Sequence, residues 1–399
     1  MSETCHQVSQ SRIHSIDAFR AVTMLLMIWV NDFWSLIDIP HWLQHMAAED
    51  DALGFSDVIF PAFLFIVGLS IPFAIENRKN KGDINGTILR HILERSFALL
   101  LMGFFMVNLE SLSGGGLPKW QWQVLMTLSF FLIWNIYPQK ECCRFFNIGM
   151  RALGYLILIF LAIVYQGPGD PAIWMKPYWW GILGLIGWAY AYSATLYLFW
   201  GKKWLWMFFA WAFFALFNIL DTAGWLSALS GIRGYVWISG SGSNAALTMA
   251  GVIVSSLYLQ SYQQQDKGQF FKFLLISGAV ILALGLALRP LEGISKIRAT
   301  PSWTQICTGI SILAYAALFW LIDMRSQKSW MKIIQPAGTS TLTCYLVPYF
   351  AYAAVIALGT SLPAGLRTGA TGLIKSMLFA FIIVWVTGLI NRLGIKLKI

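Results

Sequence analysis

Long apolar segments recur along the whole of this sequence, and they limit the folds that the chain can adopt. Within a bilayer only helices and closed barrels satisfy every backbone hydrogen bond, and a spanning helix needs about 20 apolar residues. Twelve runs reach about this length, to within about 2–4 residues at each boundary. They cover residues 18–36, 57–76, 90–109, 121–137, 149–165, 179–200, 203–221, 243–262, 270–289, 304–323, 339–358 and 371–391.

The charge content favours a membrane protein over a soluble one. Only 12% of the 399 residues are charged and 58% are hydrophobic, whereas a soluble domain carries about 25% charged residues. Because the runs at 121–137 and 149–165 are short, we predict an all-α polytopic membrane protein with about 10–12 transmembrane helices. We see no internal repeat and no separate soluble domain, so we expect residues 1–399 to form a single integral membrane domain.

The distribution of positive charge predicts the orientation of the chain. A net charge of +10 would suggest a nucleic-acid ligand in a soluble protein, but membrane proteins concentrate Lys and Arg in their cytoplasmic loops. With the N-terminus inside, 20 of the 28 Lys and Arg lie inside and 8 outside. We therefore expect no nucleic-acid partner, a cytoplasmic segment at 1–17, transmembrane helices and loops over 18–391, and a cytoplasmic tail at 392–399.

Polar and ionisable side chains gather between the first two apolar runs. Asn31 and Asp32 end the first run, His41 and His45 lie in the loop, and Asp57 opens the second run. Such groups at the mouth of a membrane helix pair are costly, so they indicate a functional site. A His between carboxylates can move a proton near neutral pH.

Most of these residues also have a purely structural interpretation. Asp57 can cap the second helix, or it can hold an imidazole in one tautomer. Asn31 can end the first helix, or it can donate its amide to a carbonyl oxygen that gains charge during acyl transfer. We expect Asp32 to be solvated at the membrane interface.

His41 and His45 are spaced like two zinc ligands on one helical turn. However, the Glu of the HExxH motif is missing, and Glu49, Asp50 or Asp57 would have to supply the third ligand. We therefore expect no metal site, and we interpret His41 as an interfacial loop residue.

Arg90 and Arg95 lie at the inner end of the third run, in LRHILERSF. Anchoring by the positive-inside rule explains them without further hypothesis. A guanidinium also pairs well with phosphate, so both could bind an anionic cytosolic cofactor. The sequence alone leaves these two interpretations open.

Three stretches near the N-terminus resemble a known family. They are R-I-x-S-I-D-A-F-R from Arg12, MLLMIWVN ending at Asn31, and GFSDVIFPAFLFIVGLSIP from Gly54. Together they are similar to the heparan-α-glucosaminide N-acetyltransferase family, and Ala299 to Asp323 resembles it more weakly. The resemblance implies a transmembrane acyltransferase-like bundle in the lipid bilayer. In such bundles acetyl passes from cytosolic acetyl-CoA to an amino sugar of glucosamine type on the far side. In bacterial relatives this is the periplasmic side of the inner membrane.

The resemblance also implies roles for individual residues. His45 matches the catalytic His, as general base or acetyl carrier, with Asp57 beside it and Asn31 at the acetyl carbonyl. Acetyl-CoA would be the acyl donor, with Arg90 and Arg95 as candidate binding residues. The acceptor would be an amino sugar or glycan. The resemblance leaves open whether the protein forms a homodimer. The family's H-A-x-W-N-G is replaced here by His45-Met-Ala-Ala-Glu-Asp. The resemblance therefore supports the type of reaction more strongly than the identity of the acceptor.

Two other classes of function remain open from the sequence. A twelve-helix secondary transporter of a sugar or small solute fits the helix count. Against it, the loop from Glu76 to His91 lacks the Gly-Asp-Arg-type signature of the major facilitator group, and no pair of broken helices recurs in the two halves. The third class is a catalytically inactive scaffold for membrane assembly.

Overall fold

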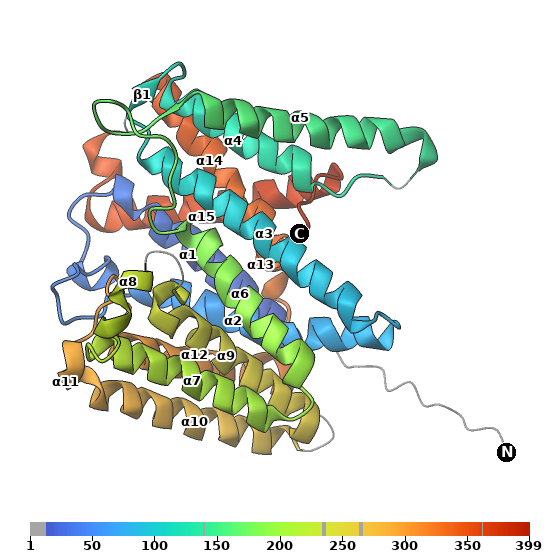
Figure 1. Ribbon diagram of the computed structural model, residues 1–399, viewed down its shortest axis with the longest axis vertical. Coiled ribbons are helices and arrows are strands. Elements are labelled where there is room, and N and C mark those ends of the chain that lie inside the picture. Colours follow the sequence, from blue (N-terminus) through green and yellow to red (C-terminus); the bar gives the residue numbers. More distant parts are fainter. Residues whose placement is uncertain (1–12, 139, 234–236, 263–265, 361) are drawn as a thin grey trace.

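Long helices make up almost the whole of the computed structural model. It describes residues 13–138, 140–233, 237–262, 266–360 and 362–399, so Cys5 and Arg12 lie outside the described residues. The described part is a bundle of helices (Figure 1). Two short strands, β1 (Gly114–Gly115) and β2 (Tyr165–Gln166), pair antiparallel.

The long helices coincide with the apolar runs of the sequence. They are α1 (His14–Asn31), α2 (Ser56–Asn80), α3 (Asn85–Glu110), α4 (Lys119–Trp134), α5 (Arg144–Ile163), α6 (Gly181–Trp200), α7 (Trp204–Thr222), α9 (Ser243–Leu257), α10 (Lys267–Ala287), α12 (Pro301–Phe319), α14 (Thr341–Leu358) and α15 (Gly369–Arg392). Among the described residues, 10 helices are long and apolar enough to cross a membrane. The predicted all-α polytopic membrane fold is therefore confirmed.

Three short helices were not predicted: α8 (Ser230–Arg233), α11 (Arg289–Glu292) and α13 (Met331–Thr339). The 9 residues of α13 are too few to cross a bilayer, and this helix packs against α1 and α15. A Cβ added to its Gly338 would lie 2.8 Å from the carbonyl oxygen of Asp17. The absence of a side chain there thus allows α13 to pack directly on the backbone of α1.

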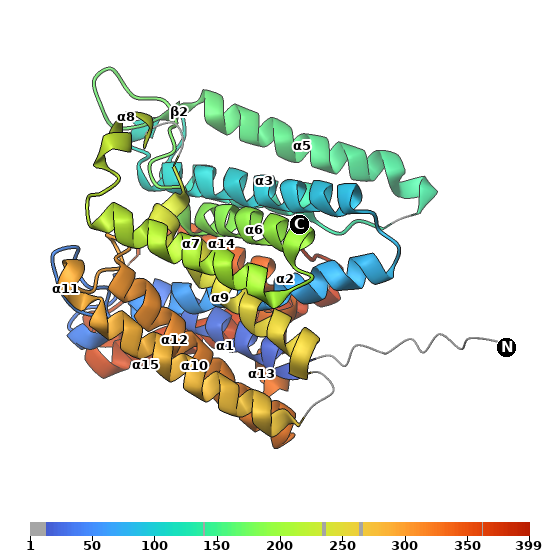
Figure 2. The ribbon, with the colours of Figure 1, turned by 60° about the horizontal axis from the view of Figure 1, so that its bottom comes forward.

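The centre of the bundle depends on close contact between helix backbones. Where α2 crosses α9, a Cβ on Gly68 would lie 1.9 Å from the carbonyl oxygen of Thr248, and one on Gly251 would lie 2.0 Å from that of Phe65. Small residues at membrane helix crossings permit such approach, and packing then replaces the hydrophobic driving force that lipid cannot supply. By contrast, α5 lies at the edge of the bundle (Figures 1 and 2), where its apolar residues are largely exposed.

The helices run between two ends of the bundle, which we name the His45 end and the terminus end. The α1–α2 loop with His45 and helix α11 lie at the first end (Figure 1). The start of α1 and the turn between α2 and α3 lie at the second. Residues 397–399 line the same cavity as Ile13 and Asp17, so the C-terminal segment also belongs to the terminus end.

Candidate active site

The loop between α1 and α2 folds back onto the first turn of α2. The backbone N–H of Phe55 donates to the Trp42 carbonyl at 2.8 Å, and Ser56 Oγ donates to the Leu43 carbonyl at 2.6 Å. A Cβ on Gly54 would lie only 1.9 Å from the Gln44 carbonyl oxygen, so this contact requires glycine. The loop is therefore fixed by its own hydrogen bonds.

His45 and Asp57 meet at the centre of this loop. His45 Nδ1 lies 2.7 Å from Asp57 Oδ1. The other carboxylate oxygen accepts hydrogen bonds from the backbone N–H of Met46 at 3.1 Å and of Gly54 at 3.2 Å. The Asp57 side chain is only 2% exposed, whereas that of His45 is 48% exposed. The carboxylate is thus buried and fixed, while part of the imidazole stays accessible.

This arrangement favours one tautomer of His45. An ionised carboxylate only accepts hydrogen bonds, so it holds the proton of the neutral ring on Nδ1. Nε2 then carries a free lone pair, which can accept a proton or attack an electrophilic carbon.

Lys296 is a third group at this centre, and sequence reasoning missed it. Its Nζ lies 3.1 Å from His45 Nδ1 and 3.8 Å from Asp57 Oδ1. Lys296 follows α11, 251 positions after His45 in the chain. Partial burial lowers the pKa of Lys296, and the nearby Asp57 charge opposes that shift. The only signal in the sequence was a Lys on the side expected to be poor in positive charge.

Asn31 is the last residue of α1 and lies at the same end as His45. The rings of Trp29 and Phe55 pack with centroids 5.9 Å apart, so the adjoining ends of α1 and α2 are neighbours. Among the contacts of the described residues, none joins the Asn31 side chain to His45 or Asp57. Its role at the acetyl carbonyl therefore stays a prediction.

The expectation of a solvated Asp32 is wrong. This residue is 4% exposed and accepts hydrogen bonds from Lys375 Nζ at 2.6 Å and from Ser376 Oγ at 2.5 Å. Both partners belong to α15, which the sequence does not place next to α1. The buried pair ties these two helices together at the His45 end.

The segment around His41 does not form the helical turn that a zinc site of the His-x-x-x-His type requires. Residues His41–Leu43 form a single 3-10 turn, and Gln44 is extended. Within the described ranges, no group of three or more His, Cys, Asp or Glu side chains is placed to hold a metal ion.

A cavity of about 860 Å³ extends from the terminus end into the bundle, between α1, α2, α3, α6 and α14. Its lining extends from Asp17 and Lys398 at the terminus end to Met27 on α1 and Phe63 on α2. Met27 is about one helical turn before Asn31, and Phe63 is about 9 Å of helix from Asp57. The cavity therefore approaches the His45–Asp57 pair from the terminus end.

The two predicted arginines of α3 lie differently with respect to this cavity. Arg95 lines it, with its guanidinium 4.6 Å from the centroid of the Tyr190 ring. Arg95 Nε is buried and has no hydrogen-bond partner within the described part of the chain. Buried donors in proteins usually have a hydrogen-bond acceptor, and an anionic ligand in the cavity would provide one for Arg95. Arg90 is not in the lining; its side chain is 80% exposed and pairs with Glu94 at 2.7 Å.

Two further cations line the cavity, and sequence reasoning did not select them. Arg20 donates to Ser70 Oγ at 2.6 Å and pairs with Asp17 at 3.3 Å. Lys398 lies in the lining with the C-terminal segment. The charge distribution along the sequence identifies Arg20 and Lys398 only as two of the positive charges of the inner side.

Comparison with known proteins places this site within a defined stretch of the chain. Residues 12–112 match the family described as heparan-alpha-glucosaminide N-acetyltransferase, catalytic. The heparan-alpha-glucosaminide N-acetyltransferase of Homo sapiens is 32% identical over 101 residues, and that of Mus musculus is 30% identical over 104 residues. These alignments cover 24% and 25% of this chain but only 14% of each relative. Residues 12–112, which include His45, Asp57 and Arg95, are therefore similar to the catalytic region of heparan-alpha-glucosaminide N-acetyltransferases.

Proposed function

We propose that this protein is a membrane acetyltransferase that moves acetyl from cytosolic acetyl-CoA to an amino sugar of glucosamine type on the opposite side. The observation that carries the proposal is the His45–Asp57 pair, joined at 2.7 Å, with a cation-lined cavity approaching it from the other end of the bundle. The family of residues 12–112 supports N-acetyl transfer as the class of reaction.

The chemistry requires a base for the acceptor. A sugar ammonium must lose a proton before its nitrogen can attack the thioester carbonyl carbon. In direct transfer, His45 Nε2 takes that proton, the new C–N bond forms, and the C–S bond breaks. The CoA thiolate leaves and is protonated to the thiol. In the covalent route, Nε2 attacks first and CoA leaves, and the acetyl-imidazole then passes acetyl to the amine.

The cavity suits the donor, acetyl-CoA. Its cationic lining residues Arg20, Arg95 and Lys398 would bind the anionic phosphates. The deeper lining, with Met24, Met27 and Phe63, is apolar. An apolar, water-poor site protects a thioester from hydrolysis and so favours transfer.

Replacement of Arg95 by Ala should weaken acetyl-CoA binding by about 1.5–3 kcal/mol, the range for hydrogen bonds to charged groups. The reason is that Arg95 lines the cavity and that its buried Nε has no hydrogen-bond partner within the described residues. Arg90→Ala should cost less, about 0–1 kcal/mol, because its charge is exposed and screened. Calorimetric titration of both variants in nanodiscs with acetyl-CoA measures the difference. Equal losses in the two variants would mean that general positive charge, and not the cavity lining, binds the donor.

Acceptor and donor are proposed to reach the protein from opposite sides, with both termini in the cytoplasm. Glu49 is exposed in the His45 loop, and Lys81 is exposed at the turn between α2 and α3. In a chain without native cysteines, we expect Glu49→Cys to react with an impermeant maleimide only from outside the cell. Lys81→Cys should react only after the membrane is permeabilised, so that the maleimide reaches the cytoplasmic side. Labelling of Glu49→Cys from the cytoplasm alone would reverse the proposed orientation.

A transfer assay tests the function itself. Proteoliposomes receive labelled acetyl-CoA on the side of the terminus end and glucosamine on the other side. We expect labelled N-acetylglucosamine on the glucosamine side only. Movement of sugar without acetylation would instead support the secondary transporter, and neither product nor flux would favour the inactive scaffold.

A further inference from the structure

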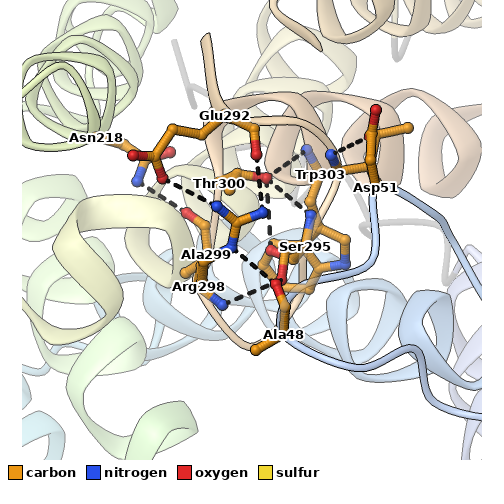
Figure 3. A network of polar contacts seen from close by, with 10 residues as sticks. Ala48, Asp51, Asn218, Glu292, Ser295, Arg298, Ala299, Thr300 and Trp303 are labelled. Carbon is orange, nitrogen blue, oxygen red and sulfur yellow. Dashed lines mark hydrogen bonds and ion pairs between the residues drawn. The ribbon is translucent and has the colours of Figure 1, made fainter. Parts of the chain in front are cut away.

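A segment far from the family-matched stretch holds the His45 loop in place. This segment, residues 289–300, joins α10 to α12 and includes α11; we name it the clamp (Figure 3). Arg298 Nε donates to the Ala48 carbonyl at 2.9 Å, and Ser295 Oγ donates to the same oxygen at 3.2 Å. Two side chains of the clamp thus converge on one backbone oxygen, three residues after His45.

The clamp also binds the far end of the loop through Asp51. Its carboxylate accepts the backbone N–H of Ile294 at 2.7 Å and pairs with Arg289 at 2.8 Å. The Ile294 N–H, followed by the Arg289 guanidinium, holds the pKa of Asp51 below its ordinary value. A lowered pKa means that this contribution is lost only as pH falls below the ordinary carboxyl range. The clamp contact therefore persists between pH 5 and about 8, where a His titrates.

Internal bonds make the clamp rigid and join it to α12. Thr300 Oγ1 accepts the backbone N–H of Ser295 at 3.0 Å and that of Trp303 at 3.4 Å, so it caps α12 (Figure 3). Asn218 of α7 donates to the Ala299 carbonyl at 3.0 Å. The indole N–H of Trp303 donates to the Asp57 carbonyl at 3.2 Å, which links the start of α12 to that of α2.

This rigid frame presents Lys296 to the nitrogen that Asp57 also contacts. Nδ1 of His45 lies 2.7 Å from Asp57 Oδ1 and 3.1 Å from Lys296 Nζ. The carboxylate is the nearer partner and accepts the Nδ1 proton, so the ammonium, which only donates hydrogen bonds, acts on the ring through its charge. The two charges act on the ring in opposite directions, since the carboxylate stabilises the imidazolium and the ammonium destabilises it.

We infer that Lys296 is a positioning residue of the proposed active site, whose charge keeps His45 neutral so that Nε2 stays free to accept a proton or an acetyl group. This inference rests on the proposed function for its consequence, but the charge effect on the ring can be measured without it. Lys296 lies outside residues 12–112, so the family match does not supply it.

The other charged and titratable groups around Lys296 do not cancel its effect on the ring. Asp57 on α2 is already the partner of His45, and Cys307 on α12 is a fully buried thiol. Within the clamp, Arg298 pairs with Glu292 at 3.3 Å, and Arg289 pairs with Asp51. Lys296 is therefore the cation that the clamp directs at His45.

The test measures the protonation of His45 directly. Diethyl pyrocarbonate modifies neutral imidazole, and mass spectrometry of the His45 peptide gives its modification rate at each pH in full-length protein in nanodiscs. In Lys296→Met, we expect the midpoint of this profile to move up by about one pH unit, because a nearby like charge is removed. Lys296→Arg keeps the charge and should restore most of the parental midpoint. Lys176→Met, a control at a Lys that lies 4.7 Å from the Tyr178 ring, should leave it unchanged.

The outcomes separate this inference from the proposed function. An unchanged midpoint in Lys296→Met would overturn the inference, and so would an equal shift in Lys296→Arg, because loss of charge would then not be the cause. A shift confined to Lys296→Met supports it even if the parent protein transfers no acetyl group. Where the parent does transfer acetyl, the acid limb of its rate profile should move with the modification midpoint.

Discussion

Replacement of His45 by Ala should lower the rate of acetyl transfer by about 10²–10⁴, the usual contribution of a general base. The variant loses Nε2, the group proposed to accept the proton of the acceptor or the acetyl group itself. Its loop should remain folded, because the bonds of Phe55 to Trp42 and of Ser56 to Leu43 do not involve the His45 side chain. Acetyl-CoA binding should stay near the parental value, since the cavity lining does not include His45.

His41→Ala is the matched control for this experiment. His41 lies in the same loop, is exposed, and belongs to the 3-10 turn that precedes Gln44. Its replacement should leave transfer nearly unchanged. Labelled acetyl transfer, acetyl-CoA titration and thermal unfolding of both variants separate catalysis from binding and folding. Full activity in His45→Ala would contradict the proposal that His45 is the base or acetyl carrier. It would favour the alternative that the protein is a secondary transporter.

The helices were predictable because a bilayer imposes one length and one polarity on each of them. The prediction was less accurate at polar helix ends. The first run was expected to continue to residue 36, but α1 ends at Asn31 and a 3-10 turn follows at Phe33–Ser35. Asp32, at the junction, turns toward Lys375 of α15. Hydropathy along the chain contains no information about that partner, which lies 343 positions away.

The site was predictable only where its residues are close in sequence. His45 and Asp57 are 12 positions apart and share one loop and the helix that follows it. Lys296 and the cavity depend instead on helices that meet only in the folded bundle. The cavity takes its lining from several helices and the C-terminal segment, so no local pattern could have indicated that Arg95 faces it while Arg90 does not.

One signal in the sequence could have indicated part of the missing site. The positive-inside rule assigned eight Lys and Arg to the outer side, where such residues are unfavourable without a reason. Five of these eight contact the end of α1 or the loop between α1 and α2: Arg289 at Asp51, Lys296 at His45, Arg298 at Ala48, Arg367 at Ser35 and Lys375 at Asp32. Most of the exceptions to the rule in this chain therefore have a specific partner near the His45 loop.

Replacement of Asp57 by Ala should lower both stability and activity. The carboxylate accepts hydrogen bonds from two backbone N–H groups, contacts His45 and lies 3.8 Å from Lys296 Nζ. Removing it leaves the buried N–H groups of Met46 and Gly54 without an acceptor, and each unsatisfied buried group costs about 1–3 kcal/mol. We expect a marked fall in unfolding temperature together with loss of transfer.

Asp57→Asn should separate the two effects, because the amide keeps the shape but loses the charge. The amide oxygen can still accept from the N–H groups of Met46 and Gly54, which places the amide NH₂ toward His45 Nδ1. The ring must then accept on Nδ1 and carry its proton on Nε2, where it blocks the proposed base. We expect stability nearer to that of the parent than in Asp57→Ala, and a rate between those of His41→Ala and His45→Ala. Parental transfer in Asp57→Asn would mean that the tautomer of His45 is not set by Asp57, and that the carboxylate serves only to fold the loop.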